Sequence, residues 1–411
     1  MKSGFLTEML SRGYLNQCTD FDRLDKICSS KKITAYIGFD STAESLHVGS
    51  LLQIMILRLL QKYGHQPIIL LGGGTTLIGD PSGKDSTRKI LRQREIKKNI
   101  TGIKKNFSKL MNFKKNKPIF VNNLDWLGKL KYIEFLRNIG AHFTINKMLT
   151  FDSVKVRLDR QQSLSYMEFN YMILQAYDFY QLNVKKNCIL QLGGSDQWGN
   201  IVNGVELIRR VSKKDAFGLT SPLITLASGA KMGKTEKGAV WLNEKLFSPY
   251  DYWQFWRNTD DKDVKQFLKF FTDIDVEEIE KICQTETNIN NLKILLANEA
   301  TKILHGKQKS KESEKIASET FKLGKLSEKL PEIKIRNSDL KIGVPLINIL
   351  LENSISNSKS EARRMIKGRG IKIENIIVND ENKKLNQLDF LNKKNLKLSF
   401  GKKRHFLIKI I

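Results

Sequence analysis

Apolar and polar positions follow two alternating patterns over the first two hundred residues. Short runs of β-branched and aliphatic residues predict strands, whereas residues 51–63 repeat apolar positions with a helical period. The predicted strands are 33–39, 67–71, 118–122 and 188–192. Glycines follow two of them, at 72–74 and 193–194. This alternation is typical of a parallel sheet with helices on both faces, where ligands bind beyond the carboxyl ends of the strands.

From Ser248 to Gly306 the pattern is helical. Ser248 is a favourable N-cap, and Pro249 follows at the first helical position. Apolar residues then recur at helical spacing, and we interpret them as core: Tyr252, Phe255, Trp256, Val264, Phe267, Leu268 and Phe271. Gly306, directly after His305, is expected to end a helix.

The charged segment 307–341 predicts a short helix and then a linker. In the last seventy residues, a serine cap begins a predicted helix, Gly368 ends it, and the alternation of Ile371 and Ile373 predicts a strand. The helix carries three basic residues, Arg363, Arg364 and Lys367. We expect a separate small α+β unit here.

Basic residues exceed acidic ones by 27 in the 411-residue chain. Two segments concentrate the excess: 84–117, with thirteen basic and two acidic side chains, and 341–411, with sixteen and six. Such clusters are typical of proteins that bind nucleic acids, because Lys and Arg release counterions from phosphates. Ile, Lys and Asn are abundant throughout, however, which indicates compositional drift as a second cause.

Cysteine content and hydropathy exclude other classes. Four cysteines occur without a Cys-x-x-Cys pair, which favours buried thiols in a reducing compartment over a metal or disulfide site: Cys18, Cys28, Cys188 and Cys283. The most apolar run, 51–60, has about half the length that a bilayer requires. The first residues lack the apolar run and cleavage site of a signal peptide. We expect a soluble cytoplasmic protein.

Three segments rich in glycine and polar residues carry the candidate chemistry: 36–50, 193–197 and 231–235. Each has an ordinary explanation by itself. A histidine before a glycine is compatible with a helix start, and a Lys-x-Gly-Lys turn is compatible with a solvated loop.

Together, in this order and spacing, the segments resemble the signature of class I aminoacyl-tRNA synthetases. His47-Val48-Gly49-Ser50 resembles the motif named HIGH, and Lys231-Met232-Gly233-Lys234-Thr235 resembles the one named KMSKS. Longer matches narrow the resemblance to bacterial tyrosyl-tRNA synthetases, from about residue 4 to the end. They are Tyr-x-Gly-Phe-Asp at 36–40, Gly-Asp-Pro-Ser-Gly-Lys at 79–84, Tyr-Met-Ile-Leu-Gln-Ala-Tyr-Asp-Phe at 171–179 and Gln-Leu-Gly-Gly-Ser-Asp-Gln-Trp-Gly-Asn at 191–200.

The resemblance implies the fold and the domain order. A Rossmann-like, parallel-sheet catalytic domain (1–225) is expected first, then a KMSKS-type loop and α-helical anticodon-side domain (226–320). A linker (321–341) and a small α+β RNA-binding domain (342–411) follow. The implied activity is that of a tyrosine–tRNA ligase, which activates L-tyrosine with ATP, releases pyrophosphate and transfers the tyrosyl group to tRNA(Tyr). The resemblance also implies a homodimer, magnesium accompanying ATP, and no tightly bound protein cofactor.

The implied site residues suit this chemistry. The tyrosine carboxylate is ionised at neutral pH, so the enzyme needs to supply positioning and cations rather than a general base. Around the phosphates the resemblance places Thr42, His47, Lys84, Arg88, Lys231, Lys234 and Thr235. At L-tyrosine it places Tyr36 and Asp178 on the phenol hydroxyl, Asp80, Tyr171 and Gln175 on the α-ammonium group, and Gln191 and Gln197 at the carboxyl. At ATP it places Gly38, Asp40, His47, Ser50, Gly194, Asp196 and Lys234, and at RNA it places Arg363, Arg364 and Lys367.

The chain departs from the usual pattern at three positions. Ser50 stands where histidine or asparagine is usual, Ser41 replaces a usual proline, and Glu44 stands where aspartate is common. Serine keeps a donor but is shorter, so we expect a modest penalty in ATP binding at Ser50.

Three questions stay open at this point. Tryptophanyl-tRNA synthetase is the alternative within the class, and Asp178, the Gly-Ser-Asp-Gln segment and the C-terminal module argue against it. A catalytically silent RNA-binding protein is the alternative outside it; the intact motif residues argue against decay, and loss of activity in Lys234→Ala would exclude it. Apart from Lys84 and Arg88, the basic residues of 84–117 either contact the acceptor stem of tRNA or form a surface that is basic through compositional drift. The composition of the chain favours the second explanation.

Overall fold

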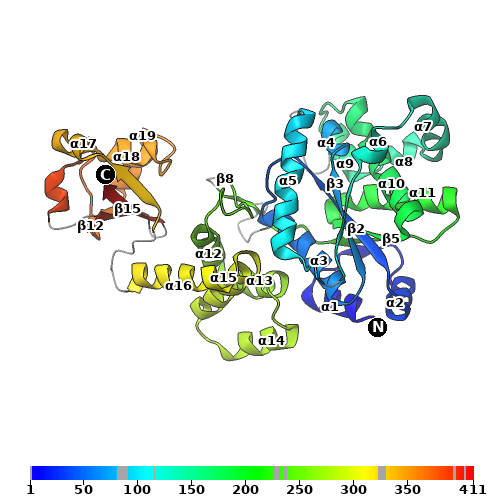
Figure 1. Cartoon of the computed structure of the whole chain (residues 1–411), viewed down its shortest axis with the longest axis horizontal. Coiled ribbons are helices and arrows are strands. Elements are labelled where there is room, and N and C mark those ends of the chain that lie inside the picture. Colours follow the sequence, from blue (N-terminus) through cyan, green and yellow to red (C-terminus); the bar gives the residue numbers. More distant parts are fainter. Residues whose placement is uncertain are drawn as a thin grey trace. The chain divides into compact units, whose positions relative to one another are not determined.

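The computed structural model describes residues 2–80, 91–114, 116–225, 232–235, 238–322, 330–391, 395–401 and 404–411. For residues 152–153, 234–235 and 320–322 it describes the backbone alone. The chain forms two compact units, Met1–Ser310 and Lys311–Ile411 (Figure 1).

A six-stranded sheet organises the first unit, in the order β1-β6-β5-β2-β3-β4. Its strands are β1 (Gln17–Cys18), β2 (Thr34–Asp40), β3 (Gln66–Gly72), β4 (Ile119–Asn122), β5 (Cys188–Gly194) and β6 (Phe217–Ser221). All neighbours pair in parallel except β1, which is antiparallel to β6. The predicted parallel sheet is confirmed, and the strand bounds agree with the predicted ones to within two residues.

The strand order reverses between β2 and β5. The connection from β2 through α3 (Leu51–Lys62) leads to β3, and the connection from β5 through α11 (Trp198–Ser212) leads to β6 on the other side. Because such crossovers are right-handed, α3 and α11 cover opposite faces of the sheet. The crevice at this reversal, beyond the carboxyl ends of β2 and β5, is where open α/β sheets bind ligands.

The remaining helices of this unit cover the sheet or follow it along the chain. They are α1 (Gly4–Arg12), α2 (Phe21–Ser30), α4 (Thr75–Ile78), α5 (Gln93–Leu110), α6 (Leu124–Leu127), α7 (Tyr132–Asn138), α8 (Ile145–Leu149), α9 (Asp152–Asp159), α10 (Tyr166–Lys186), α12 (Pro249–Arg257), α13 (Val264–Phe271), α14 (Val276–Thr285) and α15 (Ile289–His305). A short hairpin pairs β7 (Lys234–Thr235) with β8 (Gly238–Ala239). Helix α16 (Lys307–Lys322) crosses the boundary between the units.

The predicted helical region after Ser248 is confirmed. The Ser248 hydroxyl accepts a hydrogen bond from the amide of Asp251 and caps α12, and Gly306 ends α15. Trp256 is fully buried, with its ring 4.8 Å from that of Phe271. Of the residues interpreted as core, Phe255 alone is only partly buried.

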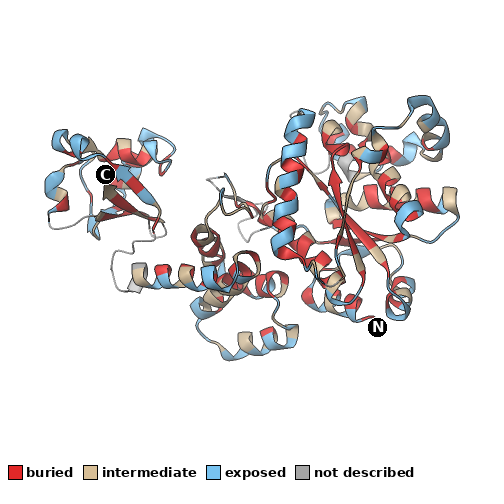
Figure 2. Cartoon of the chain, in the orientation of Figure 1, coloured by how far each residue is buried: buried red, intermediate tan, exposed pale blue. Residues whose placement is uncertain are grey.

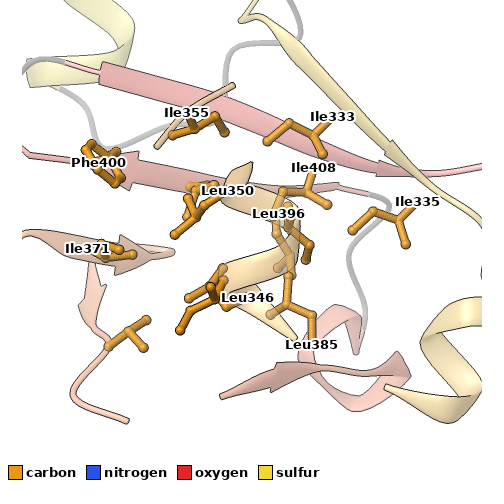
Figure 3. Packing of buried hydrophobic residues seen from close by; sticks show 14 of the residues in the cluster. Ile333, Ile335, Leu346, Leu350, Ile355, Ile371, Leu385, Leu396, Phe400 and Ile408 are labelled. Atoms are coloured by element: carbon orange, nitrogen blue, oxygen red, sulfur yellow. The ribbon is translucent and has the colours of Figure 1, made fainter. Parts of the chain in front are cut away.

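The second unit is a five-stranded sheet, in the order β12-β11-β14-β15-β9, with helices packed on it. Its elements are β9 (Glu332–Ile335), α17 (Asn337–Ile342), β10 (Val344–Pro345), α18 (Leu346–Glu352), α19 (Lys359–Lys367), β11 (Ile371–Ile373), β12 (Ile376–Ile377), β13 (Lys384–Leu385), β14 (Asn395–Phe400) and β15 (Arg404–Ile410). Isoleucines and leucines from most of these elements meet in one apolar core (Figure 3). The predicted α+β fold of this region is confirmed.

The structure differs from the expected linker over 321–341. Residues 332–335 form β9, which pairs in parallel with β15, and residues 337–341 belong to α17. Ile333, Ile335 and Leu340 are buried in the core of the second unit. The alternation of charged and apolar residues at 332–335 is a strand pattern with one buried face, which the high local charge obscures in the sequence.

Candidate active site

A cavity of about 300 Å³ lies at the crevice between β2 and β5. Residues 36–40 of β2 line it. Of these, Tyr36, Gly38 and Asp40 lie on one face of the sheet, because strand residues alternate between faces. Helix α10 presents residues at spacings of three and four, which lie on one side of a helix. Twelve predicted site residues line the cavity: Tyr36, Gly38, Asp40, Ser50, Asp80, Tyr171, Gln175, Asp178, Gln191, Gly194, Asp196 and Gln197.

Asp178 and Tyr36 are buried side chains of this cavity. One Asp178 carboxylate oxygen accepts a hydrogen bond from Trp126 Nε1 at 2.6 Å, and the other accepts one from Asn123 Nδ2 at 2.9 Å. Burial raises the pKa of Asp178 to about 7, although both donors oppose this shift. The Tyr36 hydroxyl has no hydrogen-bond partner among the described residues, and burial raises its pKa well above the usual range. An aromatic hydroxyl can therefore donate to Asp178 and also bond with Tyr36.

A chain of hydrogen bonds continues from Asp178 to Asp40. Asn123 Nδ2 also donates to the Thr75 hydroxyl at 3.0 Å, and this hydroxyl donates to Asp40 Oδ1 at 2.8 Å. The Tyr171 hydroxyl donates to the other Asp40 oxygen at 3.2 Å. Residues at the carboxyl ends of β2, β3 and β4 are thereby connected to α10.

A second group of polar residues joins the segment after β5 to Asp80 and to α10. Gln197 Nε2 donates to Asp80 Oδ2 at 3.0 Å, and Asn200 Nδ2 donates to the Oε1 atoms of Gln197 and Gln175, at 3.1 and 3.0 Å. Asp80, Gln175 and Gln197 all line the cavity. This carboxylate and these amide oxygens form a suitable environment for a cationic group such as an ammonium ion.

Gly194 and Gly38 line the cavity without side chains of their own. A Cβ on Gly38 would make an ordinary van der Waals contact with Leu70, at 3.6 Å. A Cβ on Gly194 would come within 2.6 Å of Asp196 Oδ1. Glycine here allows a flat ligand to approach the backbone closely.

The two motif segments that are far apart in the sequence are in contact. The Val48 amide donates to the Val240 carbonyl at 2.9 Å, and the rings of His47 and Trp241 are 6.2 Å apart. A Cβ on Gly233 would lie 2.5 Å from His47 Nδ1, and one on Gly49 would lie 2.8 Å from the Met232 carbonyl. Gly233 also has a φ of 107°, which side chains other than glycine rarely adopt.

The remaining predicted phosphate residues are placed only in part. Thr42 is exposed and does not line the cavity. His47 is not among the lining residues either, but Gly49 and Ser50, which follow it closely in the sequence, are. Lys84, Arg88 and Lys231 fall outside the described residues. The backbones of Lys234 and Thr235 form β7.

Sequence reasoning missed four polar residues that support the cavity: Thr75, Asn123, Trp126 and Asn200. Asn123 comes directly after the predicted strand 118–122, and Thr75 follows the predicted strand 67–71 after three glycines. The rule for parallel sheets therefore signals both positions. Asn200 lies within the motif segment 191–200. No signal in the sequence marks Trp126, because its indole reaches Asp178 only through the tertiary fold.

The predicted RNA-binding residues lie on one exposed side of α19. Ser358 caps this helix, and Ala362 and Ile366 face the core. Arg363, Arg364 and Lys367 are exposed. The carboxylate of Glu381 lies 3.7 Å from Arg363 Nε and 3.2 Å from Lys367 Nζ, so it offsets part of this charge.

Two further properties concern the described residues only. No group of three or more His, Cys, Asp or Glu side chains among them is arranged to hold a metal ion. None of their helices combines the length and apolarity needed to cross a membrane.

Comparisons with known proteins cover nearly the whole chain. Residues 29–322 match the family "tRNA synthetases class I (W and Y)", and residues 322–408 match the "Tyrosine--tRNA ligase SYY-like C-terminal domain". The chain is 59% identical over 409 residues to a tyrosine–tRNA ligase of Pelagibacter ubique, covering 99% of each chain. It is 52% identical to one of Rickettsia prowazekii, covering 99% of this chain and 100% of the relative.

Solved structures agree with these matches. A C-terminally truncated Aspergillus nidulans mitochondrial tyrosyl-tRNA synthetase superposes with a TM-score of 0.70 at 30% identity, covering 78% of this chain and 95% of that one. A tryptophanyl-tRNA synthetase from Encephalitozoon cuniculi has the same fold, with a TM-score of 0.56 at 14% identity, covering 75% of this chain and 87% of that one.

Proposed function

Because the chain belongs to the class I tyrosyl-tRNA synthetases, we propose that its cavity holds L-tyrosine and ATP side by side for their reaction. The activity has two steps. The tyrosine carboxylate first attacks the α-phosphate of ATP, giving tyrosyl-adenylate and pyrophosphate. The tyrosyl group then passes to the 3′ end of tRNA.

The observation that carries this proposal is the pair of buried polar groups, Tyr36 and Asp178, at the cavity. Tyr36 and Asp178 are both buried at the cavity, and the Tyr36 hydroxyl lacks a partner among the described residues. A bound tyrosine hydroxyl would donate to Asp178 and bond with Tyr36. Phenylalanine would leave the Tyr36 hydroxyl unpaired and would give Asp178 only the two donors that the fold supplies, and a buried unpaired polar group is costly. Tyrosyl-tRNA synthetases are themselves the standard example of such rejection, which reaches about 10⁵-fold in the family.

The other end of L-tyrosine is assigned by the same logic. Asp80, Tyr171 and Gln175 would hold the α-ammonium group, since a cation needs acceptors and a carboxylate. Gln191 and Gln197 would flank the reacting carboxyl. Gly38, Gly194 and Asp196 would approach the adenosine, with Asp40 and Ser50 at the nucleotide.

Activation then depends on positioning and on charge. Thr42, His47, Lys84, Arg88, Lys231, Lys234 and Thr235 would stabilise the charge that develops on pyrophosphate as it leaves. Contact between the His47 and Gly233 segments supports a joint role at the phosphates. Magnesium would enter bound to ATP, since Mg²⁺ is commonly held by substrate phosphates and few protein groups.

The assignment of RNA contacts follows the domain order. The helical region 226–320 would serve the anticodon side of tRNA, and residues 342–411 would bind RNA through Arg363, Arg364 and Lys367. Their exposure on α19 supports contact with phosphates. We place the reaction in the cytoplasm; the four unpaired cysteines support a reducing compartment.

Exposed apolar residues support a homodimer. Helix α7 has no buried residue, and its Tyr132 and Ile133 are 60% and 73% exposed. Further exposed apolar side chains follow on α8, α9 and the start of α10: Ile145, Leu149, Val156, Leu158 and Tyr166. A second copy of the chain is the occupant we propose for this surface, since large exposed apolar patches mark protein interfaces. Ile133→Asp should give monomers in analytical ultracentrifugation, whereas Ile376→Asp, at an isoleucine 74% exposed in the second unit, should not.

The experiment that tests the proposed function is amino-acid-dependent exchange of labelled pyrophosphate into ATP. Tyrosine, tryptophan and phenylalanine are compared in parallel with the full chain. Exchange with tyrosine alone is expected. Exchange with tryptophan instead would contradict the assignment of Tyr36 and Asp178. No exchange with any of the three from folded protein would favour a silent RNA-binding protein.

A further inference from the structure

Helix α5 carries basic residues along one exposed side. Its apolar residues face inward, with Ile96, Ile103 and Phe107 among them. At 100° per residue, its six exposed outward cations fall within an arc of about 140°. We define them as the α5 basic face: Arg94, Lys97, Lys98, Lys104, Lys105 and Lys109. Figure 2 shows exposed residues along the outer side of α5.

Nearby acidic side chains neutralise this face only in part. Lys98 pairs with Glu44, and Lys109 Nζ lies 3.3 Å from a Glu244 oxygen. Lys104 Nζ lies over the Phe120 ring, 5.6 Å from its centroid. Arg94, Lys97 and Lys105 form no ion pair within the described part of the chain. These three cations are therefore available to an anionic partner.

The inner side of the same helix holds the segment that leads to the candidate active site. Asn99 Nδ2 donates to the Ser41 carbonyl at 2.8 Å, and Asn106 Oδ1 accepts from the Leu46 amide at 2.9 Å. A Cβ on Gly102 would lie 1.9 Å from the Glu44 carbonyl, so helix and segment are in direct contact. Asp40, Leu46 and Ser50 around this segment line the cavity. Lys98 of the α5 basic face pairs with Glu44 of this segment, so the face borders the segment that leads to the cavity.

The geometry points to an RNA-binding surface: we propose that the α5 basic face contacts the phosphate backbone of the tRNA arm that carries the 3′ end. This rests on the aminoacylation activity, which requires that end to reach the cavity. A helix of this length spaces Arg94 and Lys105 about 17 Å apart along its axis, which suits several successive phosphates. Such contacts position RNA without reading its bases. Composition favours drifted surface for this run, whereas its arrangement on one side of a helix beside the cavity favours tRNA.

The test uses the full chain with the substitutions Arg94→Glu, Lys97→Glu and Lys105→Glu together. A matched variant, Lys26→Glu, Lys31→Glu and Lys186→Glu, changes the net charge equally at exposed lysines of α2 and α10 and after α2. Aminoacylation of tRNA(Tyr) is measured between 50 and 200 mM salt, and tyrosine-dependent pyrophosphate exchange is measured without tRNA. The α5 variant should lose at least about tenfold in kcat/KM for tRNA at low salt. The slope of log kcat/KM against log salt should be shallower by about 3 in this variant, at about 0.9 per lost contact with a duplex phosphate.

Pyrophosphate exchange separates this proposal from the proposed function. Exchange should be unchanged in both variants, and its absence in the unaltered protein would be a failure of the function and not of the surface. If exchange also falls in the α5 variant, the triple change to glutamine, which preserves helix propensity, replaces it. Equal kcat/KM for tRNA in the α5 variant and the matched variant, or an unaltered value in the glutamine variant, would overturn the proposal.

Discussion

At one end of the cavity the polar side chains are buried and hydrogen-bonded to one another, whereas at the other they are more exposed. Tyr36, Asp178 and Asn123 are almost fully buried, and two of them belong to a network fixed within the fold. Around the expected phosphate site, Thr42 is exposed and Ser50 is half-buried. There, the segments of His47 and Gly233 contact each other through backbone groups and through glycines, namely Gly49 and Gly233.

This difference corresponds to two chemical tasks. Discrimination between amino acids requires groups that lose energy when a ligand fails to pair with them, and burial provides this loss. Stabilising a leaving pyrophosphate requires cations and donors near the phosphates, which exposed side chains can supply. We therefore expect substitutions at the buried end to have larger and more selective effects than those at the exposed end.

The largest effect is expected for Asp178→Asn. The amide has one acceptor oxygen, so its NH₂ group would face either Asn123 or Trp126, and the substrate hydroxyl would lose a charged acceptor. At about 1.5–3 kcal/mol for a charged hydrogen bond plus the unpaired donor, kcat/KM for tyrosine should fall about 10³-fold. Pyrophosphate exchange measures this. Asp125→Asn, at an exposed position on the same helix as Trp126, should have no effect, and a comparable loss there would refute a local role of Asp178.

The pH dependence of tyrosine activation should follow Asp178. Its raised pKa of about 7 means that the carboxylate, the form that would accept from the substrate hydroxyl, is lost as pH falls through 7. Between pH 8 and pH 6, kcat/KM for tyrosine should therefore fall about tenfold. Trp126→Phe removes a donor to the carboxylate, so this variant should shift the decline to higher pH. A decline with the same midpoint in both proteins would assign it to another group.

A smaller effect is expected for Tyr36→Phe. Asp178 would still accept from the substrate, and only one neutral hydrogen bond would be lost, worth about 0.5–1.5 kcal/mol. Exchange with tyrosine should weaken about two- to tenfold. Exchange with phenylalanine is the control. It should stay equal or rise, because the substitution removes the hydroxyl that phenylalanine leaves unpaired. Equal losses with both amino acids would indicate a packing defect at this buried position.

The smallest effect is expected at the exposed end, for Ser50→His. The Ser50 side chain makes no capping hydrogen bond at the start of α3 and lines the cavity, so a longer donor there can reach the nucleotide. The Michaelis constant for ATP should fall about two- to threefold, as for part of one hydrogen bond. An unchanged constant together with unchanged turnover would show that serine carries no penalty. The constant for tyrosine serves as the control.

Local patterns explain why the central fold could be predicted. Buried parallel strands such as Ile68–Leu71 within β3 are continuous apolar runs, which hydropathy alone detects. Strand β6 was missed, because its Gly218, Thr220 and Ser221 give little apolar signal although all are buried. Tertiary contact, rather than local composition, determines that segment.

The same distinction applies to the candidate site. Residues within long motifs, such as Asp178 and Gln197, could be named from the sequence because a family resemblance supplied their expected roles. Thr75 and Asn123 could have been found from their positions after strands. Trp126 could not, because it donates to Asp178 across a separation of 52 residues that only the tertiary fold closes. The distance in space between two side chains that are far apart in the sequence is determined by the tertiary fold alone.

Asn123 has a thermodynamic consequence that extends beyond specificity. One side chain accepts from the Gly74 amide at 2.7 Å and donates to both Thr75 and Asp178, so it joins the ends of two strands to a helix. The side-chain entropy of these groups is therefore lost when the protein folds rather than when the ligand arrives. Affinity gained in this way costs little ordering at the binding step. The free energy of folding thus maintains the rigidity with which this end of the cavity would hold a small aromatic ligand.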